Sequence, residues 1–170
     1  KVRKGNLGAL ALNGIATAGA SIEPEDDDDP TVFSSVSVTK SPNIDIARFR
    51  VIASVGNKND STANYLIKSD GGLSLDAMTI MSRDDATDCM NWTKADWLAW
   101  AWSGIQFTGP GNYATVCSLF GVNFGLSTVA PDNVFSLNYI HGSSADGIRL
   151  NGDRCVARGN MASAFVLIDA

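Results

Sequence analysis

The chain has 170 residues, 45% of them hydrophobic, with a formal net charge of −5 and an isoelectric point near 4.7. This length fits one domain comprising residues 1–170, and no apolar run is long enough for a membrane-spanning helix. The acidic balance argues against a nucleic-acid partner, which would need a basic face. Three cysteines, Cys89, Cys117 and Cys155, and a single histidine argue against a disulfide framework and a zinc site, so we expect no metal and no cofactor.

The first part of the chain predicts short strands separated by turns. Leu10 and Leu12 predict an early strand, and residues 32–38 alternate in the manner of one strand. Between them, residues 23–30 form an acidic block, which we interpret as a solvated loop, with a calcium site as the alternative.

Further short strands follow a turn at residues 41–43. Residues 44–51 and 65–67 carry apolar residues in strand-like alternation. Gly72-Leu73 then opens another strand with a Gly-plus-aliphatic pair that recurs later in the chain.

Residues 83–103 form an insertion rich in tryptophan. Thr93 and Asp96 resemble a capping box, which predicts a short helix over residues 94–102. Three roles for the tryptophans are open: they seal the insertion against the rest of the fold, they form a platform on which sugar rings stack, or they anchor a subunit interface. The candidate carbohydrate-binding or interface residues are Trp92, Trp97, Trp100 and Trp102.

The second half of the chain repeats with a period of 21 to 22 residues. Gly104-Ile105, Gly125-Leu126 and Gly147-Ile148 each open an apolar run, which is followed by a turn and a second apolar run. We expect these glycines to supply the positive φ of sharp corners. Asn138 and Asn160 are also 22 residues apart, so their amides are expected to form a ladder. Such a period of short strands and turns is typical of a solenoid, in which each coil covers the next.

The fold class predicted is therefore all-β: a single-stranded right-handed parallel β-helix of about six coils with a short helical insertion. Residues 144–152 and 155–160 resemble the coils of right-handed parallel β-helix proteins, a family that includes pectate-lyase-like enzymes and bacteriophage tailspikes. The resemblance in coil pattern covers residues 104–160 and extends to 42–81. It implies the fold but no particular activity, because a shared fold does not carry a shared site.

Two carboxylates are candidates for catalysis. Asp146 and Asp153 flank one predicted strand, and glycoside hydrolysis needs two carboxyl groups around the bond. The alternative is that both are turn residues. Arg149, with Arg154 and Arg158 close by, would line one side of a coil and hold an acidic sugar, or would only solvate that side. The motif series that marks polygalacturonases is absent.

The function favoured by these features is that of a virion-associated β-helix protein. The chain begins without Met and stops inside an apolar run, so we expect a piece of a longer polypeptide, or ends that abut a partner. A tailspike, tail-fibre or capsid-decoration protein would have a structural and surface-recognition role, with glycan binding, in a homotrimer or beside neighbouring virion subunits. The alternative is a secreted polysaccharide lyase or glycoside hydrolase of the pectate-lyase-like superfamily. Either one places the protein in a virion or outside the cell.

Overall fold

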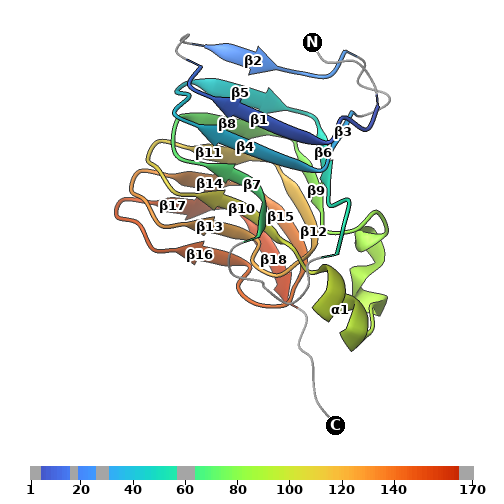
Figure 1. Ribbon diagram of the computed structural model, residues 1–170. Coiled ribbons are helices and arrows are strands. Elements are labelled where there is room, and N and C mark those ends of the chain that lie inside the picture. The colour runs from blue at the N-terminus through green and yellow to red at the C-terminus, as the bar shows by residue number, and fades with distance from the viewer. Residues whose placement is uncertain (1–4, 16–18, 26–30, 57–63, 165–170) are drawn as a thin grey trace.

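The structure is a computed structural model that describes residues 5–15, 19–25, 31–56 and 64–164. Within them the chain winds through a stack of six coils, with the first coil at the top of Figure 1 and the sixth at the bottom. The prediction of an all-β solenoid built from parallel strands is confirmed.

Three parallel sheets of six strands run along the stack, and each sheet takes every third strand of the chain. The first sheet contains β1 (Ala9–Asn13), β4 (Ser35–Thr39), β7 (Tyr65–Ser69), β10 (Ser103–Phe107), β13 (Leu126–Thr128) and β16 (Ile148–Leu150). The second contains β2 (Ala20–Ile22), β5 (Ile44–Ala47), β8 (Leu73–Asp76), β11 (Tyr113–Thr115), β14 (Val134–Ser136) and β17 (Val156–Arg158). The third contains β3 (Val32–Phe33), β6 (Arg50–Ile52), β9 (Thr79–Met81), β12 (Ser118–Val122), β15 (Tyr139–Ser143) and β18 (Met161–Ala164).

The inward side chains of successive coils form vertical columns. In the first sheet Ile105 pairs with Leu126 and Leu126 pairs with Ile148, as the repeat predicts. The column continues upward through Ile67 and Val36. The four members from Val36 down to Leu126 are buried, and removing each such side chain from water stabilises the fold by about 2 kcal/mol.

The strands of the second sheet are bracketed by residues with left-handed backbone. β5, for example, lies between Asn43 at φ 57° and Arg48 at φ 62°. The residues that precede the six strands are Gly19, Asn43, Gly72, Gly111, Asp132 and Arg154. The residues that follow the five later strands of this sheet, β5, β8, β11, β14 and β17, are Arg48, Ala77, Val116, Leu137 and Gly159. These two columns turn the chain sharply at both edges of the sheet.

The predicted alignment of Gly72-Leu73 with Gly104-Ile105 is wrong. Leu73 lies in the second sheet and pairs with Ile44, whereas Ile105 lies in the first sheet. Gly72 belongs to the left-handed column, which starts strands of a different sheet. The pairs look alike in sequence because both place a glycine before an inward aliphatic side chain.

The glycines of the repeat also act differently from the prediction. Gly104, Gly125 and Gly147 do not have left-handed backbone. A Cβ on Gly104 would lie 2.6 Å from the carbonyl oxygen of Gly125, and one on Gly125 would collide with the carbonyl of Gly147. Glycine is needed here because consecutive coils approach closely, whereas Gly142 and Gly159 do have positive φ.

Residues 32–38 form two strands in different sheets, and the single strand predicted there is wrong. β3 ends at Phe33, and β4 begins at Ser35. The backbone N–H of Ser34 donates to the carbonyl of Gly8 at the corner between them. The alternation shifts by one residue at the corner, because the partly buried Ser34 and Ser35 both stand between the buried Phe33 and Val36.

The amide ladder predicted from Asn138 and Asn160 is present. The Asn138 Nδ2 donates to Asn160 Oδ1 at 2.9 Å. A second ladder, which the sequence did not reveal, joins Asn112 Nδ2 to Asn133 Oδ1 at 2.9 Å. Buried amides satisfied in this way replace the backbone hydrogen bonds that corners lack.

The insertion between β9 and β10 covers part of the third sheet. It comprises a 3₁₀ segment, η1 (Ala86–Asn91), and the helix α1 (Lys94–Trp100), and η1 packs on β12 and β15. The capping box is confirmed: Asp96 N–H donates to Thr93 Oγ1 at 3.2 Å, and Thr93 N–H donates to Asp96 Oδ2 at 3.0 Å. No helix among the described residues is long and apolar enough to cross a membrane.

Candidate functional site

The tryptophans join the insertion to the coil stack. Trp92 and Trp97 are 7% and 3% exposed, and their rings meet edge to face with centroids 5.1 Å apart. Trp102 packs on the main core and donates its Nε1–H to the carbonyl of Val55 at 2.9 Å. Trp100 is partly buried beside the buried pair. Trp92 and Trp97 therefore leave too little ring exposed for a sugar to stack on, and a binding role for Trp100 or Trp102 stays a prediction.

Two glycines on the third sheet form the seat of the insertion. Gly121 and Gly142 have φ of 60° and 71° and lie one coil apart on β12 and β15. A Cβ on Gly121 would lie 2.8 Å from the Trp92 ring, and one on Gly142 would press into Cys89 Sγ. The seat follows the coil period, so the 21-residue spacing of these glycines was the signal that could have revealed it.

Arg83 ties the two halves of the insertion together. Its guanidinium lies over the Trp92 ring at 4.5 Å and donates from Nη1 to Asp96 at 2.8 Å. Hydrogen bonds from Thr93 and then from Arg83 lower the pKa of Asp96 from 3.8 to about 2. Hydrogen bonding to Asp85, and then to Asp96, raises the pKa of Arg83.

Acid is expected to loosen the insertion before it unfolds the sheets. Because the pKa of Asp96 is depressed on folding, its contribution is complete above about pH 4 and is lost as the pH falls toward 2. Tryptophan fluorescence should change over this window while the β-sheet circular dichroism stays constant. D96N should show the acid spectrum already at pH 7. Identical fluorescence titrations of the two proteins would contradict this.

The predicted catalytic carboxylates lie at opposite ends of β16. Asp146 precedes the strand and Asp153 follows it, and both side chains are exposed. The three residues of β16 alone separate the two corners by about 10 Å. Asp146 Oδ2 lies 3.9 Å from Arg149 Nε, and the Arg149 guanidinium lies 5.5 Å from the centroid of the Phe124 ring. A catalytic role for Asp146 and Asp153 stays a prediction.

The three cysteines are free thiols. Cys117 is buried, and burial raises the pKa of its thiol to about 12. Cys155 is only partly buried. Across residues 5–15, 19–25, 31–56 and 64–164, no group of three His, Cys, Asp or Glu side chains is placed to hold a metal ion. Most of the acidic block, residues 26–30, lies outside the described residues.

A groove that the sequence did not reveal runs along the outer face of the second sheet in the upper coils. Its volume is about 310 Å³, and it is lined by Gly19, Asn43, Asp45, Gly72, Leu73, Ser74, Gly111 and Tyr113. A second hollow of about 460 Å³ adjoins it at the corner with the first sheet and shares Asn43, Gly72 and Gly111. Together they form one open trough beside the left-handed corner.

The outward side chains of the groove stand in register on three successive coils. Asp45 pairs with Ser74, and Ser74 pairs with Tyr113. The strands lie about 4.8 Å apart, so a carboxylate, a hydroxyl and a phenol ring repeat at that interval. Tyr113 is 49% exposed. Gly72 and Gly111 at the corner carry no side chain to fill the trough.

No family model matches the chain, and neither a curated protein nor a solved structure matches it. The likeness to parallel β-helix proteins therefore rests on the coil pattern of the sequence and on the fold.

Proposed function

We propose that the protein is a structural and surface-recognition module of the virion-associated β-helix type, such as a tailspike, tail fibre or capsid decoration. The coil stack acts as a scaffold, and the groove on the second sheet binds a glycan. The observation that carries this proposal is the exposed Tyr113 ring in register with Ser74 and Asp45 in an open groove.

These three side chains suit a saccharide chain. An aromatic face packs against the C–H faces of a pyranose ring, and the phenol hydroxyl remains free to hydrogen-bond. The Asp45 carboxylate accepts hydrogen bonds from sugar hydroxyls, and Ser74 both donates and accepts them. Because the row repeats with the coils, it suits an extended polymer that lies along the stack.

The carboxylates of the trough favour binding over hydrolysis. Among the described residues, Asp45 is the one carboxylate that lines the groove itself, and Asp70 lines the adjoining hollow. The Asp70 carboxylate already accepts a hydrogen bond from the Lys40 backbone N–H at 2.8 Å. Glycoside hydrolysis needs two carboxyl groups that are free to act on one bond.

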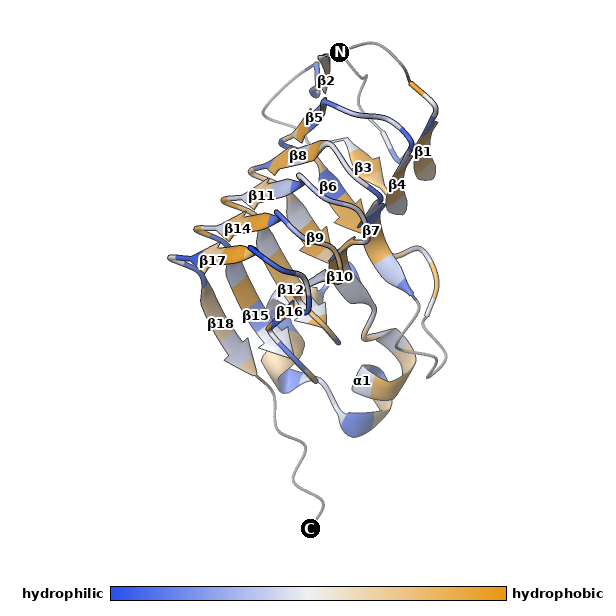
Figure 2. Ribbon diagram, turned by 90° about the vertical axis from the view of Figure 1, so that its left-hand side faces the viewer, coloured by the Kyte–Doolittle hydropathy of each residue, from blue (hydrophilic) through white to orange (hydrophobic). Residues whose placement is uncertain are grey.

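The lower half of the stack supports a role in assembly. Val116 and Leu137, at the corner of the second and third sheets, are 49% and 62% exposed, and Tyr139 beside them is 38% exposed. Figure 2 shows further hydrophobic residues on β14 and β17. Apolar patches of this kind mark interaction surfaces. We assign to this face the homotrimer, or the contact with neighbouring virion subunits, that the sequence predicts without naming a surface.

The second candidate function is that of a polysaccharide lyase or glycoside hydrolase. It is favoured by the exposure of Asp146, Arg149 and Asp153 on one coil, where they are accessible to a polymer. Turnover of an acidic polysaccharide that is lost in D146A or D153A would establish this function.

Binding to an immobilised panel of neutral and acidic polysaccharides tests the glycan groove. Y113A should weaken binding about tenfold, because the stacking face is lost. D45N should weaken binding of neutral glycans, since it exchanges an ionised acceptor for a weaker one.

The matched control is V156A, which alters the same outward column two coils below Tyr113 and outside the groove. It should bind like the unmodified protein. Undiminished binding by Y113A, with its circular dichroism unchanged, would refute the groove as the glycan site.

A further inference from the structure

Two carboxylates stand close together on the outer face of the second sheet. Asp45 of β5 and Asp76 of β8 occupy outward positions of their strands, and both side chains are exposed. Asp45 pairs with Ser74, and Asp76 pairs with Ala47, so the two carboxylates lie diagonally across neighbouring strands. With strands about 4.8 Å apart and a rise of about 3.3 Å per residue, their Cα atoms are about 8 Å apart. A small cation that lies between them is within reach of both.

Neither carboxylate has a counter-charge on its own face. In the part of the chain that the structure describes, Asp45 and Asp76 form no ion pair. Arg48, which follows β5, binds Glu23 at 3.0 Å. Arg158 shares the outward column of Asp76 but lies three strands below it, about 14 Å along the stack. That exceeds the Debye length of about 10 Å at about 0.1 M salt, so the charge of Arg158 is largely screened from Asp76.

The adjoining hollow leaves the net charge of the trough negative. Lys40 and Asp70 are the charged residues among the described ones that line the hollow, and their charges cancel. Asp45 is the charged residue of the groove, whose other described lining residues are glycine, asparagine, serine, leucine and tyrosine. A polymer of acidic sugars is therefore repelled from the trough, whereas a polymer that carries positive charge is attracted to it.

Ser74 stands at the centre of the side chains that a bound sugar would meet. It pairs with Asp45 of the coil above and with Tyr113 of the coil below. Asp76 lies two residues further along the same strand, on the same face. An aromatic ring, a hydroxyl and two carboxylates consequently surround one stretch of the outer face.

We propose that the glycan bound by this groove is an amino-sugar polymer whose amino groups are unacetylated and positively charged. The Tyr113 ring stacks on a pyranose ring, and Asp45 and Asp76 bind the ammonium group of the chain. This inference rests on the proposed function, because it names the class of glycan that the same groove selects.

The chemistry of these groups suits an ammonium ion. An ammonium has three N–H donors, and a hydrogen bond between an ammonium and a carboxylate is about twice as strong as one between neutral groups. The face of the Tyr113 ring also attracts a cation. Acetylation of the amine removes the charge, so the carboxylates would distinguish the two forms of one sugar.

Isothermal titration with two oligosaccharides of equal length tests the proposal. One is built of glucosamine and the other of N-acetylglucosamine, so they share rings and linkages and differ in the charge of the nitrogen. At a mildly acidic pH that keeps the amines protonated, the unmodified protein should bind the glucosamine oligosaccharide about tenfold more tightly, because two exposed ion pairs contribute about threefold each. Added salt should reduce this preference, since exposed charges are screened.

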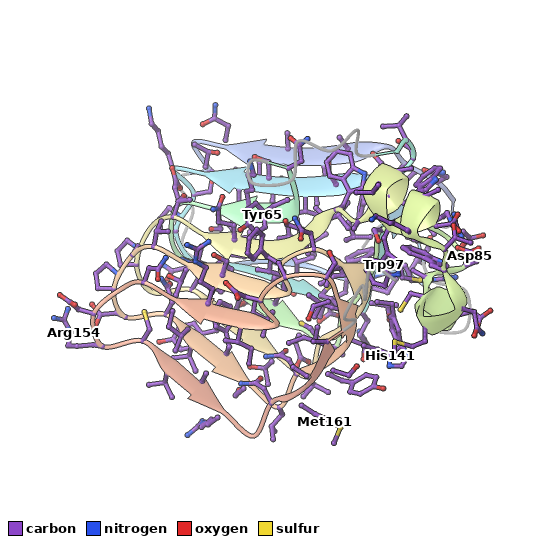
Figure 3. The ribbon with its side chains drawn as sticks, turned by 90° about the horizontal axis from the view of Figure 1, so that it is seen from below. Tyr65, Asp85, Trp97, His141, Arg154 and Met161 are labelled. Atoms are coloured by element: carbon purple, nitrogen blue, oxygen red, sulfur yellow. The ribbon has the colours of Figure 1, made fainter. Side chains whose placement is uncertain are left out.

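The double variant D45N/D76N should bind the two oligosaccharides equally, and D45N alone should lose about a threefold share of the preference. The matched control for D45N is D84N, which removes the same charge from a side chain that is 88% exposed. Figure 3 looks along the stack and shows the neighbouring Asp85 on the insertion, on the opposite side of the molecule from Arg154 at the corner column that bounds the trough. D84N should therefore keep the full preference.

Three results would overturn the inference. The unmodified protein could bind the N-acetylated oligosaccharide as tightly as the glucosamine one, or the preference could survive in D45N/D76N. D84N could also weaken binding as much as D45N, which would mean that the net charge of −5 attracts the ligand without a site.

Y113A separates failure of the inference from failure of the proposed function. If the unmodified protein shows no preference but Y113A weakens binding of both oligosaccharides, the groove binds glycans and only the selectivity for amino groups is refuted. If Y113A binds both as the unmodified protein does, the groove is not a glycan site, and the proposed function fails with the inference.

Discussion

Replacing Gly125 with alanine is expected to lower the free energy of unfolding by about 3 kcal/mol. The added Cβ would collide with the backbone carbonyl of Gly147, which is held by its hydrogen bond from the Leu126 N–H at 2.9 Å. A backbone group cannot rotate away as a side chain can, so two coils must separate locally. Urea unfolding monitored by circular dichroism measures the loss.

The control for Gly125 is Gly111→Ala. Gly111 has φ 72°, and a Cβ there would meet nothing within 4 Å, so only the left-handed backbone opposes alanine. The cost should be about 1 kcal/mol. Equal losses in the two variants would show that close approach of the coils is not what requires glycine in this column.

Replacing Asn133 with alanine is expected to cost about 4 kcal/mol. Its Oδ1 accepts from the Asn112 backbone N–H at 2.8 Å and from Asn112 Nδ2 at 2.9 Å. Its Nδ2 donates to Thr128 Oγ1, to Ala130 O and to Gly109 O. Each buried partner left without a hydrogen bond costs about 1–3 kcal/mol, and the alanine side chain satisfies none of them.

Thermal or urea unfolding of the Asn133 variant measures this loss. N151A is the control, because Asn151 is an exposed corner residue of the next coil, and its change should stay within about 0.5 kcal/mol. If N133A and N151A unfolded at the same denaturant concentration, the amide ladder would make no measurable contribution to the free energy of unfolding.

The parts of the fold that were predicted correctly are those that repeat over short distances in the chain. Ile105, Leu126 and Ile148 form one column because no insertion interrupts the chain between them, so equal spacing means equal height. The Asn138–Asn160 ladder follows from the same regularity. The start of the helix after Thr93 was predictable because a capping box lies within four residues.

The sequence-based predictions were wrong where the spacing of residues along the chain does not correspond to their position in the coil stack. Gly72 precedes the insertion, so counting residues from Gly104 assigned it to the wrong sheet. Residues 32–38 resemble one strand although the chain bends at Ser34, because β-branched and aromatic residues stand on both sides of the serine pair at the corner. The role of Gly104 could not be predicted from the sequence. Glycine is required both by a positive φ and by the close approach of two coils, and the sequence does not distinguish the two causes.

The candidate site depended still more on the tertiary structure. Asp45, Ser74 and Tyr113 come from three coils, and the distance along the chain from Ser74 to Tyr113 includes the whole insertion. Their common row exists only once the strands are paired. The seat at Gly121 and Gly142 is likewise defined by what lies against it, namely the buried Trp92 and Cys89.

By itself, the sequence determined that short strands stack at a regular interval, because strands this short bury their apolar faces only against copies of themselves. The tertiary structure decided which residues share a column and where side chains from distant segments meet. Those features depend on the register between coils, which hydrogen bonding and packing set over the whole stack and no local pattern encodes.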